Sequence, residues 1–124
     1  MDTVAAAASL DYPQYRTFLL DDGNSPDVRR AIEGLNKGRK QGQGEVIYMA
    51  RDKKAGEPHF YKSGNIRFGL DATASDGGGA GFVAALDVDM VPESDWLRRL
   101  IPYLILNKNA AMVVPPQVCG FQVT

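Results

Sequence analysis

The sequence has few of the residues that usually indicate a compartment or a metal. Its 124 residues contain one cysteine, Cys119, and one histidine, His59. A single cysteine cannot form a disulfide within the chain, and we expect an idle or structural thiol because no motif surrounds it. Cysteine poverty mildly favours a reducing compartment but leaves the question open. We interpret His59 as a loop residue or a support behind a site, since no second candidate ligand lies near it in sequence.

An excess of charge and a long apolar run are also absent. Lysine and arginine number 14 against 15 acids, so the formal net charge is -1 and no basic face indicates nucleic acid or an anionic membrane. No apolar run approaches the roughly 20 residues that cross a bilayer. The N-terminus carries an acid, Asp2, where a signal peptide needs basic residues. We therefore expect a soluble chain of one modest domain, without a nucleic-acid partner.

What the sequence does contain is an alternation of strand-like and helix-like segments. Apolar runs with β-branched or aromatic residues predict four strands, at residues 15–20, 45–50, 82–86 and 110–114. Helical composition, apolar spacing and capping residues predict four helices. Three lie at residues 4–10, 26–36 and 62–75, the last with Ser63 as its cap. The fourth begins at Pro92 and carries an apolar stripe within residues 96–104. This order indicates βαβ units, hence an α/β fold with a mostly parallel sheet flanked by helices.

Acidic residues follow two of the predicted strands. Asp21 and Asp22 end the first strand, and Asp87 and Asp89 end the third. Ligands of such sheets bind beyond the carboxyl ends of the strands, so this placement predicts a site. Asp87 and Asp89 can hold Mg²⁺ or Mn²⁺ bridging a nucleotide diphosphate. The alternative is a solvated acidic loop.

The other candidate residues also have a structural alternative. Asp21 or Asp22 can accept hydrogen bonds from a nucleobase or a ribose, but an Asx-type turn is the alternative. Lys62 and Asn65 start a predicted helix, where phosphate can bind, but an ordinary helix start with an exposed lysine is also compatible. The glycine run at 76–81 precedes a strand, which predicts a connector and not a phosphate loop.

Five segments in order resemble processive family 2 glycosyltransferases, including cellulose synthase-like enzymes: FLLDDG (18–23), KSGNI (62–66), LDVDMVP (86–92), WL (96–97) and VPPQ (114–117). The resemblance implies a Rossmann-like GT-A fold with three layers, a nucleotide-sugar donor such as a UDP-hexose, a divalent metal and a glycan acceptor. Transfer would displace the diphosphate at the anomeric carbon with inversion. The implied site residues are Asp21, Asp22, Lys62, Asn65 and Asp87 for the donor, with Asp87 and Asp89 for the metal.

The resemblance also implies segments that have no counterpart here. These are the family's first strand, its Thr-Glu-Asp type segment with the catalytic base, its Gln-x-x-Arg-Trp motif and its membrane helices. We therefore expect a fragment truncated at both ends, with residues 1–117 as a partial nucleotide-sugar-binding domain, 118–124 as a tail, and the base unknown. In a 3-2-1-4 strand order the first strand is central, so we expect unpaired or re-paired strands without it.

Two other functions stay open on the sequence. The chain could be a non-catalytic nucleotide-binding or interaction module that keeps the αβ scaffold, because a fold does not fix a function. It could also be a degenerate fragment without activity. The missing base segment and the missing first strand favour these two, whereas the retained aspartates and Lys62 favour the glycosyltransferase.

Overall fold

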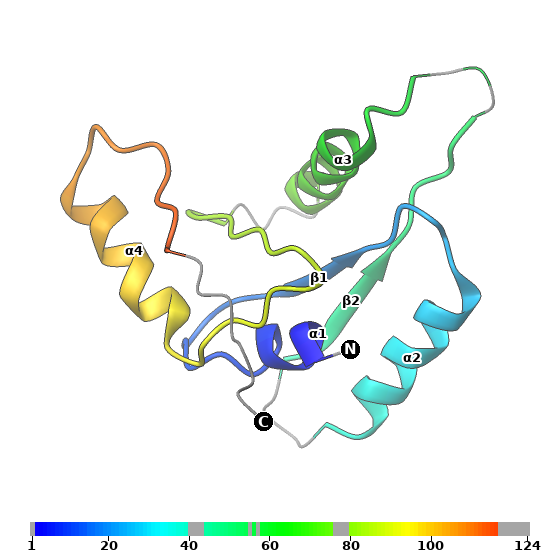
Figure 1. Ribbon diagram of the computed structural model, residues 1–124, viewed down its shortest axis with the longest axis horizontal. Coiled ribbons are helices and arrows are strands. Elements are labelled where there is room, and N and C mark those ends of the chain that lie inside the picture. Colours follow the sequence, from blue (N-terminus) through cyan, green and yellow to red (C-terminus); the bar gives the residue numbers. More distant parts are fainter. Residues whose placement is uncertain (1, 40–43, 55, 57, 76–79, 117–124) are drawn as a thin grey trace, which may run out of the picture.

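A computed structural model describes residues 2–39, 44–54, 56, 58–75 and 80–116. Within these ranges the chain forms four helices and one two-stranded sheet (Figure 1). The elements in order are α1 (Asp2–Ala7), β1 (Thr17–Leu20), α2 (Pro26–Lys37), β2 (Val46–Met49), α3 (Tyr61–Ser75) and α4 (Trp96–Leu106). The α/β class predicted from the sequence is therefore confirmed.

β1 and β2 are parallel and are joined through α2 as one βαβ unit. The register pairs Thr17 with Val46 and Leu20 with Met49. Side chains alternate between the two faces of a strand, so this register divides the apolar residues into two sets. One face carries Leu19, Val46 and Tyr48, and the other carries Phe18, Leu20, Ile47 and Met49. Both faces need a cover, as expected for a parallel sheet.

Helices cover the two faces and make three layers. On the first face, α1 and α2 bring a small core together with the sheet: Val4, Ala8, Ile32 and Val46, with Leu19, Leu35 and Tyr48 packed against it. On the second face, α3 packs on β1 through Gly69, where an added Cβ would lie 2.8 Å from Cδ1 of Leu20. The missing side chain lets the helix approach the strand closely. The arrangement is visible in Figure 1.

Local signals explain why α2 begins where it does. Oγ of Ser25 accepts a hydrogen bond from the backbone N–H of Val28 at 3.4 Å, and Pro26 occupies the first turn. A serine N-cap satisfies one of the orphan donors of the first turn, and proline there loses no hydrogen bond. Ile32 is the buried residue of the helix. The predicted helix at 26–36 differs from the observed one by a single residue.

The helix α4 begins later than the sequence pattern predicted. Pro92 does not start it, because the chain first turns at Glu93, whose carbonyl accepts from the N–H of Trp96 at 3.1 Å. The predicted apolar stripe lies on the covered side of α4: Ile101 is buried, and Trp96, Leu97, Leu100 and Leu104 are half-buried. Tyr103 and Leu106, which lie outside the stripe, are exposed. Among the described helices, none is both long and apolar enough to cross a membrane.

The predicted strands at 82–86 and 110–114 are wrong. A strand needs a neighbour that supplies partners for its N–H and C=O groups. The family resemblance places another strand between β1 and residues 82–86, and the described residues contain none. Residues 82–85 are instead exposed, and the following turn is held by the hydroxyl of Thr3, which donates to the carbonyl of Val88 at 2.6 Å.

Some sequence predictions fall outside the described residues. They concern residues 40–43 of the polar connector predicted at 38–44, residues 76–79 of the glycine run at 76–81, Gln117 of the VPPQ segment, and the 118–124 tail with Cys119.

Candidate functional site

Asp21 builds the loop that follows β1. Its backbone N–H donates to the carbonyl of Met49 at 2.9 Å and so extends the sheet by one bond. Its carboxylate then accepts the N–H of Gly23 at 2.9 Å and that of Ser25 at 2.7 Å. The hydroxyl of Tyr48 donates to Oδ2 at 2.8 Å. The bond from Gly23 is that of the Asx-type turn that the sequence left open, whereas donor binding by Asp21 stays a prediction.

The ionisation of Asp21 and Tyr48 reflects this network. Burial raises the pKa of the Asp21 carboxyl. The hydrogen bonds that lower its pKa come from four donors: the backbone N–H of Ser25, the hydroxyl of Tyr48, and the backbone N–H groups of Gly23 and Asn24. Together they outweigh burial, so the pKa lies below its ordinary value. Burial and the hydrogen bond to Asp21 raise the pKa of Tyr48.

Asp22 is held by two basic residues that follow β2. Nε of Arg51 donates to its Oδ1 at 2.6 Å, and Nζ of Lys53 donates to its Oδ2 at 2.7 Å. The hydrogen bond from Arg51, followed by that from Lys53, lowers the pKa of the Asp22 carboxyl. Neither base was predicted from the sequence, because only the acids at the strand ends indicated a ligand there. The position of the two bases directly after β2 could have indicated them, because the carboxyl ends of β1 and β2 lie side by side at one edge of a parallel sheet.

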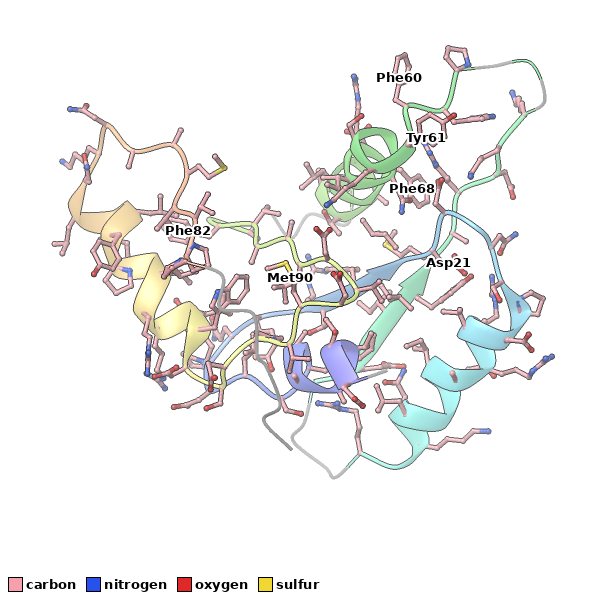
Figure 2. All side chains as sticks on the ribbon, viewed as in Figure 1. Asp21, Phe60, Tyr61, Phe68, Phe82 and Met90 are labelled. Atoms are coloured by element: carbon pink, nitrogen blue, oxygen red, sulfur yellow. The ribbon has the colours of Figure 1, made fainter. Side chains whose placement is uncertain are left out.

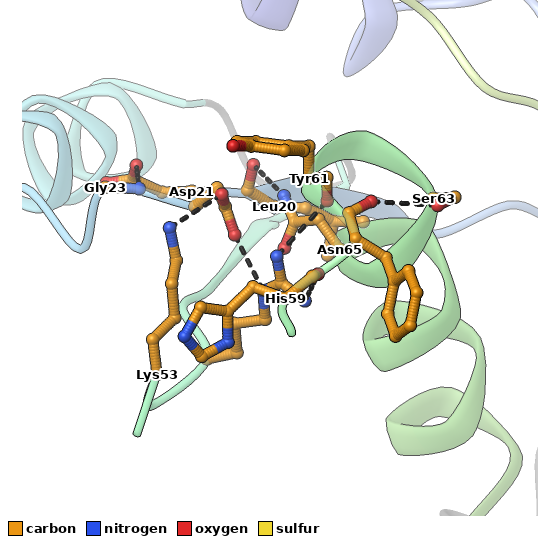
Figure 3. Close-up of polar contacts among 11 residues, drawn as sticks. Leu20, Asp21, Gly23, Lys53, His59, Tyr61, Ser63 and Asn65 are labelled. Carbon is orange, nitrogen blue, oxygen red and sulfur yellow. Dashed lines mark hydrogen bonds and ion pairs between the residues drawn. The ribbon is translucent and has the colours of Figure 1, made fainter. Parts of the chain in front are cut away.

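Arg51 also reaches the chain that enters α3. Its Nη1 donates to the carbonyl of His59 at 2.6 Å and its Nη2 to the carbonyl of Tyr61 at 3.2 Å (Figure 3). Its side chain is only 12% exposed, compared with 32% for Asp22. His59 takes part through its backbone oxygen and lies in the loop before α3, as its interpretation as a loop residue predicts.

The start of α3 adopts an unusual backbone. Phe60 and Tyr61 have positive φ angles, of 52° and 39° respectively. This left-handed region is uncommon for bulky residues and stores strain, often near functional sites. Both side chains are exposed, Tyr61 by 86%, and Figure 2 shows them at the end of α3 nearest Asp21. The predicted cap is wrong, because the hydroxyl of Ser63 donates to the carbonyl of Phe60 at 2.8 Å.

Asn65 and Lys62 connect α3 to the two acidic clusters. Nδ2 of Asn65 donates to the carbonyl of Leu20 at 3.1 Å, immediately before Asp21. Nζ of Lys62 forms an ion pair with Oδ1 of Asp87, a residue 25 positions further along the chain. Two predicted donor-binding residues thus meet. No hydrogen bond or ion pair among the described residues links Asp21 or Asp22 with the second acidic cluster.

Asp87 and Asp89 lie in one tight turn. The N–H of Met90 donates to the carbonyl of Asp87 at 3.0 Å, and both carboxylates are exposed. Within the part of the chain that the structure describes, no group of three potential metal ligands is present. Magnesium is commonly bound by one or two carboxylates together with substrate phosphates. Two carboxylates from a single turn fit that ligand set.

Comparison with known proteins identifies the family. The family model described as "Glycosyl transferase family 2" matches residues 2–123. The chain belongs to glycosyl transferase family 2. This confirms the resemblance to cellulose synthase-like enzymes that the sequence motifs carried, and with it the Rossmann-like GT-A fold class.

Relatives of this family 2 chain include plant proteins. "Probable glucomannan 4-beta-mannosyltransferase 2" of Oryza sativa subsp. japonica is 33% identical over 113 residues, which are 90% of the chain and 18% of the relative. "Glucomannan 4-beta-mannosyltransferase 2" of Arabidopsis thaliana is 32% identical over 114 residues, or 90% of the chain and 20% of the relative. The chain thus spans about a fifth of the length of these curated relatives. No solved structure gives a significant match.

Proposed function

We propose that this chain forms the nucleotide-sugar-binding part of a glycosyltransferase that transfers a hexose to a glycan acceptor, with inversion, in the complete enzyme. The observation that carries this proposal is the ion pair between Lys62 and Asp87. It joins the first turn of α3 to the turn that holds the Asp-x-Asp sequence. A cation and an acidic turn side by side suit a diphosphate with a divalent metal.

The contacts suggest a role for each residue. The carboxylate of Asp21 already accepts three hydrogen bonds from its own loop and from β2, whereas that of Asp22 accepts two, from Arg51 and Lys53. Asp22 therefore keeps more acceptor capacity and is the better candidate for the nucleoside. Lys62 would exchange Asp87 for a phosphate oxygen when the donor binds. Asp87 and Asp89 would hold Mg²⁺ or Mn²⁺. When bound, this metal supplies charge stabilisation for the departing diphosphate.

The relatives suggest the sugar and the acceptor. Their names describe mannosyltransferases of glucomannan. We therefore extend the proposal to a mannosyl group and a β-linked hexose polymer. UDP is the nucleotide that the family resemblance implies, and GDP is the natural comparison because its base presents a different set of donors and acceptors.

Calorimetric titration of the folded chain with UDP, with and without Mn²⁺, tests the proposal. We expect binding that depends on the metal and is lost in Asp87→Ala and Asp89→Ala. Asp71→Ala is the matched control, since it removes an exposed carboxylate of α3 that pairs with Arg67 on the same helix. A parallel titration with GDP identifies the base. If circular dichroism shows a folded chain that binds neither nucleotide with Mn²⁺, the donor site is refuted and an interaction module is favoured.

A further inference from the structure

Arg51 connects three segments that are separate in sequence. Its guanidinium reaches the carboxylate of Asp22 after β1, the carbonyl of His59 in the loop before α3, and the carbonyl of Tyr61 in the first turn. Each bond uses a different nitrogen of the planar group. Arginine presents its donors in such a fixed fork, whereas lysine presents one compact charge. The partners therefore depend on the shape of the arginine as well as on its charge.

The first turn of α3 leaves room for this fork. A Cβ at Gly64 would lie 2.5 Å from Nη1 of Arg51 and would collide with the carbonyl oxygen of His59. Glycine inside a helix destabilises it by roughly 0.5–1 kcal/mol relative to alanine, so its presence here needs a reason. The backbone carbonyl of His59, which lies nearest, and the guanidinium that binds this carbonyl together supply that reason.

The fork also holds the strained entry into α3. Phe60 and Tyr61 both have positive φ, and Arg51 binds the carbonyl on each side of Phe60. Strained backbone persists where the surrounding contacts fix it. Lys53 offers a contrast, because its ammonium contacts Asp22 and not the entry into α3. Both bases can neutralise Asp22, but Arg51 also holds the helix start.

We infer that Arg51 is a positioning residue, which holds Asp22 against the first turn of α3. It thereby fixes the distance between Asp22, which would bind the nucleoside, and Lys62, which would bind the diphosphate. This inference rests on the proposed function, since it assigns a further residue to the same donor site. Asp22 is the candidate for the nucleoside and Lys62 for the diphosphate, and a nucleoside diphosphate has a defined distance between these parts. A displacement of about 1 Å in such groups is enough to weaken binding and reaction strongly.

Four variants of the full chain test this role: Arg51→Lys, Arg51→Gln, Lys53→Gln and Gly64→Ala. Arg51→Lys keeps the charge near Asp22 and removes the fork, while Lys53→Gln removes a charge and keeps the fork. We expect the two Arg51 variants and Gly64→Ala to weaken UDP binding with Mn²⁺ by on the order of tenfold or more. Lys53→Gln changes it by less than about threefold, as for an exposed ion pair.

A measurement without ligand separates this role from the proposed function. Backbone amide order parameters of residues 59–63 should fall from about 0.85 toward 0.6 in Arg51→Lys and stay unchanged in Lys53→Gln. If the wild type binds no nucleotide, the donor site fails, and this measurement alone decides the role of Arg51. Arg51→Lys is the decisive variant if Arg51→Gln does not fold.

Two results overturn the inference. One is that Arg51→Lys and Lys53→Gln change UDP affinity and the amide order parameters equally, which would mean that Arg51 acts only through its positive charge. The other is that Arg51→Lys lowers Tm while the affinity of the folded fraction for UDP is unchanged, which leaves a structural role only.

Discussion

The hydroxyl of Tyr48 donates to Oδ2 of Asp21 at 2.8 Å, and this bond joins β2 to the loop that follows β1. The ring of Tyr48 lies under the guanidinium of Arg29, whose Cζ is 4.7 Å from the ring centroid. Arg29 comes from α2, so one tyrosine contacts a strand loop and the helix that covers the sheet. The loop carrying Asp22 is thereby anchored by Tyr48 as well as by Arg51.

Removing the hydroxyl in Tyr48→Phe should lower Tm, because Asp21 loses a donor while the ring packing stays. The pKa of Tyr48 is raised on folding, so this residue stabilises the fold below the ordinary tyrosine pKa of about 10 and loses that contribution as the pH rises through its folded value. The alkaline loss of stability should therefore be smaller in Tyr48→Phe. Thermal unfolding between pH 8 and about 11 measures both effects. Tyr103→Phe, on the exposed face of α4, is the control that should change neither.

Acid should destabilise the chain through Asp21. Its folded pKa lies below the unfolded value of about 3.9, so its stabilising contribution is present above that value and is lost as the pH falls through the folded pKa. Asp21→Asn should be less stable than the wild type at pH 7, and the difference should shrink toward pH 2. Thermal unfolding across this range is the measurement. A difference that stays constant with pH would contradict the role given to the Asp21 carboxylate.

The sequence predicted the elements whose signals are local. Ser25 and Pro26 mark the start of α2, and the two paired strands are apolar runs that end in turn residues. Residues 82–86 carry the same kind of run, yet they form no strand, because pairing depends on a neighbour elsewhere in the chain. A pattern of apolar residues indicates which side chains a segment can bury, but it does not indicate which strand the segment pairs with.

The residues of the candidate site likewise fall into those that short motifs predict and one that only the folded chain reveals. Lys62 and Asp87 were predicted from short motifs, and the structure brings them together. Arg51 was not predicted, because its partners come from three segments and only the folded chain places them around one guanidinium. Its signal in the sequence is weak: a base after one strand and a glycine within the first turn of a later helix.

Two helical glycines should respond in opposite ways to alanine. At Gly34 in α2, no atom beyond its chain neighbours and the helix's own backbone lies within 4 Å of the position that a Cβ would take, so Gly34→Ala should raise the free energy of unfolding by about 0.5–1 kcal/mol through helix propensity alone. Gly69 in α3 faces Leu20, with 2.8 Å from such a Cβ to Cδ1, so Gly69→Ala should lower it by about 1 kcal/mol or more through overpacking. Urea unfolding of both variants measures the contrast. Equal effects would show that α3 does not pack on β1 at Gly69.

Asn36 joins the last turn of α2 to the first residue of β2. Its Nδ2 donates to the carbonyl of Val46 at 2.9 Å, and its Oδ1 accepts the N–H of Val46 at 3.0 Å. Val46 is buried, so both backbone groups lose their partner when this amide is removed. Asn36→Ala should lower the free energy of unfolding by about 1–3 kcal/mol, the range for an unsatisfied buried polar group, reduced slightly by the better helix propensity of alanine. Urea unfolding measures the difference, and a variant as stable as the wild type would contradict this role.

Asn36→Asp separates the two bonds of that amide. The carboxylate keeps an acceptor for the N–H of Val46, but it offers no donor to the carbonyl and places a negative charge against it. We therefore expect this variant to be less stable than the wild type at pH 7 and to recover part of the loss below about pH 4, where the protonated acid donates again. Lys37→Ala, the exposed neighbour in α2, is the control. Urea unfolding at pH 7 and below about pH 4 is the measurement. If Asn36→Asp loses the same free energy of unfolding at both, the bond donated to the carbonyl of Val46 does not stabilise the fold.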